Sequence, residues 1–500
     1  MIVDNDLLSI QHARIIAENG FEAQRKLASF SQEKLDDIVN HVAESLKQHL
    51  AALAVLAHEE TDSGNWRDKQ TKNSFVCEQL PAHLKSMRCV GVIDEDSASR
   101  TMDIGVPLGV IVAICPVTSP VSTTISKALL AIKSGNAVLF SPHPGAVKSM
   151  GKVLDIIIEA AESAGLPKGC IAYLDPVAKS GTLELMKHPA TSLILATGVP
   201  GMLDAVRATG KPLIYGGTGN GPAFIERTAN INQAVKDIVT SKLFDYGLAP
   251  SAEQSIVAEA CIAEEVRSAL RQHNCYFLSK GELQQLSRTL FCPQGQLRKG
   301  MIGQPVHVLA KRAGLSIPAD TTILIAERKY VSEADPFSRE LLCPVLAFYV
   351  EADWMHACEK CIELLLHERN AHSLVIHSED KEVIKQFALK KPVGRLLVNT
   401  PASFGGIGAT TNLFPSMTLG SSSAGRGITS DNVSPMNLIY IRKVGYGVQK
   451  GEGSLEKATA NCARKVPGND APALHETTKA EAIQQILTEA IKALSDPAGR

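Results

Sequence analysis

The pattern of apolar and polar positions along the chain changes after about residue 100. Before that point apolar residues recur at steps of three and four, as in Leu35, Ile38, Val42 and Leu46, which is the spacing of an amphipathic helix. Later, short apolar runs alternate with longer amphipathic runs, and glycine- or proline-containing turns separate them. This alternation predicts parallel strands covered by helices, which is an α/β fold.

The expected elements form two blocks, each large enough for a doubly wound, Rossmann-like domain. We expect the first domain, with its N-terminal helices, to cover residues 1–222 and the second to cover residues 223–430. The expected strands are 109–115, 136–140, 192–196, 255–258, 322–326, 345–350, 373–377 and 395–399, and the clearest helices are 122–133 and 147–164. In the return segment 431–447, a late strand at 439–444 could pair across a subunit contact.

The last fifty residues have a different composition. Residues 448–477 are rich in Lys, Glu, Gly, Pro, Ala and Asn, which is typical of a flexible linker. Residues 478–496 carry apolar side chains at helical spacing and end before Pro497, which predicts a tethered amphipathic helix. A helix of this length needs a groove for its apolar face, so it either binds a partner or docks on its own subunit.

Composition narrows the classes of function. The hydrophobic fraction of 45% and the charged fraction of 21% are typical of a soluble globular protein. The net charge of -1 gives no reason to expect nucleic acid or a membrane as partner. No basic region precedes an apolar one at the N-terminus, and the 11 scattered cysteines favour reduced thiols, so we expect a cytoplasmic protein. Cys358 and Cys361 form a C-x-x-C pair without a second pair, so no metal site is expected.

Six segments, in order, resemble the CoA-acylating aldehyde dehydrogenases, the acetaldehyde and propionaldehyde dehydrogenases that make acyl-CoA. They are Pro107-Leu-Gly-Val-Ile with Pro116-Val-Thr-Ser-Pro120, Leu139-Phe-Ser-Pro-His-Pro144, Leu195-Ala-Thr-Gly-Val-Pro-Gly201, Gly216-Gly-Thr-Gly-Asn-Gly-Pro222, Pro336-Phe-Ser-Arg-Glu340 and Asn399-Thr-Pro-Ala-Ser-Phe-Gly-Gly406. The similarity covers roughly residues 20 to 447. It implies the two-domain aldehyde dehydrogenase fold, NAD or NADP as cofactor, coenzyme A as acyl acceptor, a small aldehyde as substrate and a homo-oligomer.

The resemblance also implies where the dinucleotide binds. Thr197, Gly198 and Gly201 form its cofactor turn, where glycines let backbone approach a pyrophosphate at a helix N-terminus. Without the resemblance, such a turn would most often only connect a strand to a helix. Ser141 and His143 match positions beside the adenosine ribose. Glu340 matches the carboxylate that holds the nicotinamide ribose.

The position of the catalytic cysteine departs from the family pattern. Relatives carry it in a segment like Phe-Asp-x-Gly-x-x-Cys-x-x-Glu-Gln-Ser, and here Phe244-Asp-Tyr-Gly-Leu-Ala-Pro-Ser-Ala-Glu-Gln-Ser255 aligns with Pro250 at that place. The reaction needs a thiolate that attacks the aldehyde. Proline provides no nucleophile, and it has no backbone N–H to donate to the developing oxyanion. The loss of one such hydrogen-bond donor alone costs roughly 3–4 kcal/mol of transition-state stabilisation. Cysteine-based oxidation should therefore be abolished.

Three other residues are candidates to replace the missing nucleophile. Ser251 is adjacent but has no histidine nearby in sequence, while Cys115 and Cys343 are more typical of small buried side chains. Thr118 occupies the turn position where hydrolytic relatives have an oxyanion-binding asparagine.

Two further positions bear on the substrate and the acyl acceptor. Gly217 falls where hydrolytic relatives have a water-activating glutamate, which suits transfer to a thiol. Arg426 falls on the substrate side of the pocket in relatives and could favour an anionic aldehyde, although a solvated loop arginine is the simpler interpretation.

Three functions remain open at this point. The chain could be an NAD-dependent acylating enzyme that uses another residue, or an inactive homologue that serves as a nucleotide-binding or structural subunit. It could also be a reductase that uses the same pocket without covalent catalysis. Some acylating relatives are packed into bacterial microcompartments by terminal peptides, so residues 478–496 are a candidate contact with shell proteins.

Overall fold

The computed structural model describes residues 4–367, 372–422 and 424–448. The described residues within 4–95 and 102–444 form one compact unit, and residues 96–101 with 445–448 belong to a second. In the described part of the second unit, the Tyr446 N–H donates to the Arg100 carbonyl at 3.0 Å. The expected linker and the helix at 478–496 lie outside the described residues.

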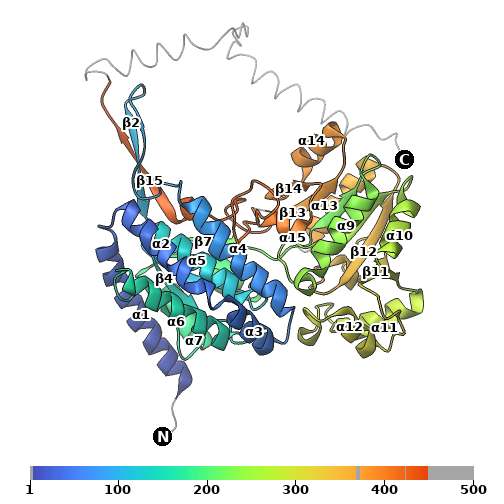
Figure 1. Cartoon of the computed structure of the whole chain (residues 1–500), viewed down its shortest axis with the longest axis horizontal. Coiled ribbons are helices and arrows are strands. Elements are labelled where there is room, and N and C mark those ends of the chain that lie inside the picture. The colour runs from blue at the N-terminus through green and yellow to red at the C-terminus, as the bar shows by residue number, and fades with distance from the viewer. Residues whose placement is uncertain (1–3, 368–371, 423, 449–500) are drawn as a thin grey trace, which may run out of the picture. The chain divides into compact units, whose positions relative to one another are not determined.

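Four helices precede the first sheet: α1 (Asn5–Leu27), α2 (Gln32–Lys47), α3 (Leu50–Thr61) and α4 (Trp66–Leu84). The predicted apolar face of α2 is confirmed, because Leu35, Ile38, Val42 and Leu46 are all fully buried. Each such side chain contributes roughly 1.5–3 kcal/mol to stability. In Figure 1 these helices lie over the first sheet and its covering helices, with α1 against β4 and α7 and α2 against α5 and α6.

The first sheet has five parallel strands in the order β5-β4-β3-β6-β7. They are β3 (Val110–Ile114), β4 (Ala137–Ser141), β5 (Ile171–Tyr173), β6 (Thr191–Thr197) and β7 (Leu213–Gly216), and the connecting helices are α5 (Pro120–Lys133), α6 (Val147–Ser163), α7 (Lys179–Lys187) and α8 (Leu203–Arg207). Strands β3 and β4 are buried at every residue, as expected for the interior of a covered parallel sheet.

The second sheet has seven parallel strands in the order β10-β11-β12-β9-β8-β13-β14. They are β8 (Pro222–Ile225), β9 (Ser255–Glu259), β10 (Cys275–Phe277), β11 (Ile323–Glu327), β12 (Val345–Glu351), β13 (Ser373–His377) and β14 (Arg395–Val398). Its helices are α9 (Ile231–Leu243), α10 (Ala263–Gln272), α11 (Lys280–Leu290), α12 (Val306–Ala313), α13 (Trp354–His367), α14 (Lys381–Lys390) and α15 (Ala402–Gly406). Two covered parallel sheets confirm the predicted α/β, Rossmann-like class. Since both sheets belong to one compact unit, the domain boundary at residue 222 stays a prediction.

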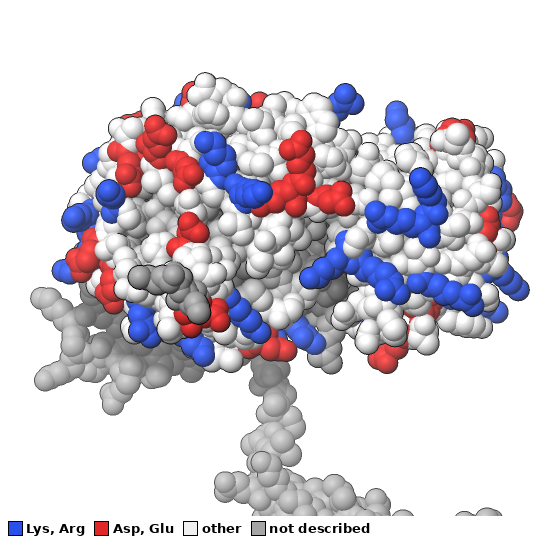
Figure 2. Space-filling model, turned by 90° about the horizontal axis from the view of Figure 1, so that it is seen from below, with Lys and Arg blue, Asp and Glu red and all other residues white. Residues whose placement is uncertain are grey.

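A third sheet, in the order β1-β2-β15, contains β1 (Gly91–Asp96), β2 (Thr101–Pro107) and β15 (Ile439–Gly445). The late strand is therefore present, while its expected pairing across a subunit contact stays a prediction. Short 3-10 helices occur at Pro200–Met202, Phe244–Gly247, Lys299–Met301, Pro336–Ser338 and Pro435–Leu438. None of the helices in the described ranges is long and apolar enough to cross a membrane. Both signs of charge occur across the face drawn in Figure 2.

Candidate active site

A small cavity of about 60 Å³ lies at the carboxyl ends of β3 and β6, against loops of the second sheet. In a doubly wound fold ligands bind outside the carboxyl ends of the strands. The residues that line the cavity are Pro116, Thr118, Ser119, Thr123, Thr197, Gly198, Gly217, Thr218, Leu248, Pro250, Glu340, Leu342 and Met417. The structure therefore brings together Thr118, Thr197, Gly198, Pro250 and Glu340 from the candidates found in the sequence.

A buried lysine fixes the strand ends beneath this cavity. Lys127 of α5 donates from Nζ to the Ile114 carbonyl at 2.6 Å and to the Leu195 carbonyl at 2.8 Å. Burial lowers the pKa of Lys127 to about 8. The two carbonyls belong to the neighbouring strands β3 and β6, so this side chain ties together the two strand ends that carry the site.

The first two residues of the predicted cofactor turn, Thr197 and Gly198, line the cavity. Gly198 has a φ of 61°, and a Cβ added to it would lie 3.0 Å from the Cβ of Pro116, so glycine suits this position. The Thr197 hydroxyl is hydrogen-bonded to that of Thr418 at 2.8 Å. Gly201 is exposed and is not among the lining residues, and the turn leads into a three-residue 3-10 helix and the five-residue helix α8.

Ser141 and His143 lie on the neighbouring strand end and do not line the cavity. Ser141 ends β4, and its hydroxyl is hydrogen-bonded to that of Thr182 at 2.8 Å. His143 Nδ1 accepts from the Gly145 N–H at 3.0 Å. Burial, with a smaller contribution from Lys299, lowers the pKa of His143, which favours a neutral imidazole. Their place beside the adenosine ribose stays a prediction.

Glu340 faces the cofactor turn across the cavity. Its Oε1 accepts from the Gly219 N–H at 2.8 Å, which ties the loop after the 3-10 helix Pro336–Ser338 to the glycine-rich segment 216–222. Gly217 also lines the cavity, and a Cβ there would lie 3.2 Å from the Cβ of Ser421. No carboxylate can therefore stand at position 217 without movement of its neighbours.

Pro250 lines the cavity beside Thr118, where the catalytic thiol of relatives is expected. A tightly turned segment positions it: Asp245 and Tyr246 have φ values of 50° and 52°, and Gly247 has a φ of 80°. Asp245 is held by the Asn65 N–H, which donates to its Oδ1 at 2.6 Å. These contacts fix the backbone, so position 250 is presented to the cavity even though its side chain carries no thiol.

The three candidate nucleophiles Ser251, Cys115 and Cys343 do not line the cavity. Ser251 is buried, and its hydroxyl donates to the Ala402 carbonyl at 2.8 Å. Cys115 is fully buried behind the turn, where Thr124 Oγ1 donates to its Sγ at 3.6 Å and burial raises its pKa. Cys343 is also fully buried, and burial raises its pKa to about 12. Each of them therefore makes structural contacts instead of facing a substrate.

Arg426 is exposed and does not line the cavity. It has a φ of 66°, and its backbone carbonyl accepts from Nη2 of Arg207 at 2.8 Å. This placement fits the simpler interpretation of a solvated loop arginine, and selection of an anionic substrate by Arg426 has no support in these contacts.

His372 was not singled out in the sequence, although it lies behind Pro250. Burial and the Arg395 guanidinium lower the pKa of His372 to about 3, while the Pro250 backbone acts in the opposite direction. A Cβ on Gly219 would lie 2.1 Å from His372 Nε2, so glycine is required beside this ring. A lone histidine before a strand gives no sequence signal for this proximity.

Glu253 provides a test of the packing behind Pro250. It is buried, its Oε1 accepts from the Ala402 N–H at 2.9 Å, and burial raises its pKa from 4.5 to about 7. The folded state therefore binds the Glu253 proton more tightly than the unfolded state. The contribution of Glu253 to the free energy of unfolding is full below pH 4.5 and is lost as the pH rises to about 7.

In wild type, the free energy of unfolding should therefore fall by an amount on the order of 3 kcal/mol over this pH range, and Glu253→Gln should remove that fall.

Urea unfolding at pH 4.5 and pH 8 would measure that decline. The matched control is Glu327→Gln, at an exposed carboxylate on β11. An equal change with pH in wild type and Glu253→Gln would contradict the prediction.

Comparison with known proteins gives a consistent answer. Residues 7–275 match the model of the aldehyde dehydrogenase family. The bifunctional aldehyde-alcohol dehydrogenase AdhE of Escherichia coli K12 is 38% identical over 441 residues, which are 87% of this chain and 49% of that protein. The chain thus spans about half the length of the curated relatives that it matches first.

Solved structures share the fold over most of the chain. An acetylating aldehyde dehydrogenase from Geobacillus thermoglucosidasius is 41% identical with a TM-score of 0.87, and 90% of this chain and 100% of that chain are covered. A propionaldehyde dehydrogenase from the Clostridium phytofermentans fucose utilisation microcompartment is 29% identical with a TM-score of 0.78, covering 86% and 96%. From its two parallel sheets, its ordered motifs and these relatives, the chain belongs to the aldehyde dehydrogenase family, with acylating members among its relatives.

Proposed function

We propose that this chain is a nucleotide-binding homologue of the CoA-acylating aldehyde dehydrogenases that does not oxidise aldehydes through a thiol. One observation supports this proposal above others: Pro250 stands in the cavity, and none of the described residues that line it is a cysteine. The competing function is NAD-dependent oxidation of a small aldehyde to acyl-CoA through another residue.

Two of the remaining lining residues suit a nicotinamide dinucleotide. Gly198 presents backbone without a side chain, as a pyrophosphate site requires, and the Glu340 carboxylate is an acceptor for ribose hydroxyls. The bound nicotinamide supplies the hydride acceptor in such enzymes. Gly217 provides no carboxylate at the position where hydrolytic relatives have a water-activating glutamate, which suits coenzyme A as acyl acceptor.

The chain lacks the group that starts the reaction. An aldehyde yields its hydride readily only after a nucleophile has added to the carbonyl and negative charge has developed on the oxygen. Pro250 cannot add, and its ring nitrogen cannot donate a hydrogen bond to that oxygen. A protein that keeps the dinucleotide site without the nucleophile acts as a nucleotide-binding or structural subunit.

Two measurements on the purified chain test the proposal. Calorimetric titration with NAD⁺ and with NADP⁺ should show binding of one of them. Spectrophotometric assay with acetaldehyde and propionaldehyde, with and without coenzyme A, should show no reduced nucleotide above background. Turnover at the rates usual for enzymes would sink the proposal, as would absence of binding by both nucleotides.

The Glu340 carboxylate carries a specific prediction for that titration. Glu340→Gln should weaken dinucleotide binding by about 10- to 100-fold, because a hydrogen bond to a charged acceptor contributes roughly 1.5–3 kcal/mol. Glu333→Gln, at an exposed neighbour, is the matched control and should leave the affinity unchanged. Equal affinity in wild type and Glu340→Gln would exclude this carboxylate from the site.

We also propose that residues 478–496, which lie outside the described residues, bind microcompartment shell proteins. The support is their helical apolar spacing and the relative from a fucose utilisation microcompartment. Removal of residues 470–500 should abolish co-assembly with shell proteins; unchanged association would refute the idea.

The exposed Tyr440 and Ile441 on β15 support a third proposal, which is pairing between copies of the chain through this strand. Sedimentation of a Tyr440→Lys variant tests it. The wild type should sediment as an oligomer and the variant as a monomer, and a monomeric wild type would contradict it.

A further inference from the structure

Hydroxyl side chains line the part of the cavity that is formed by the turn after β3 and the start of α5. They belong to Thr118, Ser119 and Thr123. Ser119 is 5% exposed and Thr123 is 1% exposed. Buried hydroxyl groups are normally hydrogen-bonded, so the hydrogen-bond partners of these two residues determine what this wall of the cavity can bind.

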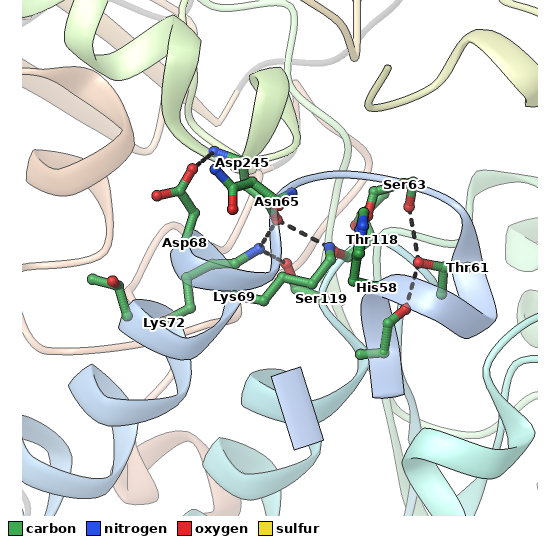
Figure 3. A network of polar contacts seen from close by, with 12 residues as sticks. His58, Thr61, Ser63, Asn65, Asp68, Lys69, Lys72, Thr118, Ser119 and Asp245 are labelled. Atoms are coloured by element: carbon green, nitrogen blue, oxygen red, sulfur yellow. Dashed lines mark hydrogen bonds and ion pairs between the residues drawn. The ribbon is translucent and has the colours of Figure 1, made fainter. Parts of the chain in front are cut away.

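The Ser119 hydroxyl is left with its hydrogen to donate. Lys72 on α4 donates from Nζ to Ser119 Oγ at 2.6 Å (Figure 3). A lysine ammonium has donors only, so this contact uses the serine oxygen as acceptor and leaves the serine hydrogen unused. Among the described residues, Lys72 is the hydrogen-bond partner of this side chain, and no acceptor takes that hydrogen.

Thr123 provides a second unused donor. Its Oγ1 is buried and has no hydrogen-bond partner among the described residues. An unpaired buried hydroxyl is costly, so a ligand atom that accepts from it makes a bond that the protein itself does not provide. The neighbouring Thr124 does not line the cavity, and its hydroxyl donates to Cys115 Sγ at 3.6 Å. The unpaired hydroxyl thus belongs to the residue that lines the cavity.

Positive charge lies directly behind this wall. Lys72 and Lys69 contact the same carboxylate oxygen, Asp245 Oδ2, at 2.5 Å and 3.1 Å, and these three side chains are at most 3% exposed (Figure 3). The further carboxylate of Asp68 is half-buried, and its Oδ2 accepts from the Asp245 N–H at 2.9 Å. Because solvent screens a half-buried carboxylate more than a buried ammonium, the Lys72 charge dominates at Ser119.

The negative group of the cavity comes from a different part of the fold. Glu340 is the one carboxylate among the described residues that line the cavity, and its Oε1 accepts from the Gly219 N–H at 2.8 Å. It precedes β12 of the second sheet, whereas the hydroxyl groups follow β3 of the first sheet. The cavity therefore has one wall of hydrogen-bond donors and one acceptor that comes from the other sheet.

We propose that Ser119 and Thr123 bind the carboxylate group of a small organic acid such as acetate or propionate. Each hydroxyl donates to a carboxylate oxygen, and the bond from Ser119 is strengthened by the charge of Lys72. The cavity of about 60 Å³ admits a ligand of a few non-hydrogen atoms, since one water needs roughly 10–15 Å³ of such space. The inference rests on the proposed function in one respect, because a cavity without a thiol at Pro250 binds its ligand without converting it.

The test measures acetate binding to the full chain without nucleotide, by NMR line broadening of the acetate methyl signal. Saturable binding with a dissociation constant roughly in the millimolar range is expected for a ligand of so few atoms. Acetamide has the size of acetate without its charge and should bind about 10-fold more weakly or worse. Pivalate has the charge on a bulkier body and should not bind. Equal affinity for acetate and acetamide, or for acetate and pivalate, would overturn the proposal.

Thr123→Val tests the site itself, because valine replaces the hydroxyl by a methyl group of similar shape. The variant should weaken acetate binding by about 10-fold or more, as expected for the loss of a hydrogen bond to a charged group. Thr124→Val on the same helix is the matched control and should bind acetate like wild type, since Thr124 does not line the cavity. The proposal fails if Thr123→Val binds acetate like wild type or if both variants weaken it equally.

Glu340→Gln separates this inference from the proposed dinucleotide site. The variant is expected to weaken dinucleotide binding, whereas removal of a negative charge from the cavity should tighten acetate binding. Weaker acetate binding by Glu340→Gln would contradict the assignment to the hydroxyl wall. If wild type binds acetate but neither NAD⁺ nor NADP⁺, the proposed function fails and this inference stands; if it binds a dinucleotide but no acetate, the reverse holds.

Discussion

Replacement of Pro250 by cysteine is expected to produce aldehyde-dependent reduction of NAD⁺ or NADP⁺, while the wild type is expected to show none. The variant gains a thiol at the position that lines the cavity beside Thr118 and Thr197. It also gains a backbone N–H that can donate to the oxyanion of the adduct. With coenzyme A present the thioester should be released as acyl-CoA, which is measured together with the reduced nucleotide.

The Pro250→Ala variant separates the two causes of the expected gain in activity, which are the thiol and the backbone N–H. Alanine restores the N–H and removes the proline ring but adds no thiol. Since one oxyanion donor contributes about 10²- to 10³-fold to the rate, the donor alone cannot start a reaction that lacks its nucleophile. We therefore expect Pro250→Ala to remain at background while Pro250→Cys turns over.

Two results would contradict this account. If wild type and Pro250→Cys oxidise aldehydes equally, the chain uses a nucleophile other than position 250. If both are inactive although Pro250→Cys is folded and binds the dinucleotide, the cavity has lost more than the thiol. Replacing proline in a loop costs on the order of 1 kcal/mol through the unfolded state, so loss of folding is not expected.

The sequence predicted the elements whose signal is long and apolar. Strands β3, β6 and β12 have five to seven residues that are mostly buried, so their runs were visible. Strands β5, β7 and β10 have only three or four residues, and β1 is almost wholly exposed, so hydrophobic alternation could not reveal them. These short strands form because they pair with neighbouring strands in the sheets, which their own sequences do not indicate.

The site followed a similar rule. Pro250, Gly198 and Glu340 stand in recognisable local segments, and the structure places all three at one cavity. The contact of Lys72 with Ser119 joins positions that are 47 residues apart on α4 and at the start of α5. No spacing within either segment encodes this contact, because it depends on how the two helices pack. Ser251 shows the converse, since its place in sequence suggested a role that its buried hydrogen bond to Ala402 does not support.

The Asp245 carboxylate should be among the most costly side chains in the protein to neutralise. Asp245→Asn is expected to lower the free energy of unfolding by about 3–5 kcal/mol, because it leaves two buried ammonium groups without their counter-charge. Asparagine keeps the oxygen that accepts from the Asn65 N–H, so the loss reports the charge. The measurement is urea unfolding of wild type and variant.

Two further variants make the attribution to Asp245 specific. Asp103→Asn removes a carboxylate whose partner, Lys443, is 71% exposed, and it should cost less than about 1 kcal/mol. Adding Lys69→Met to Asp245→Asn removes one of the two uncompensated ammonium groups. The double variant should therefore be more stable than the sum of the two single changes predicts. Strict additivity would mean that the lysines and Asp245 do not interact as charges.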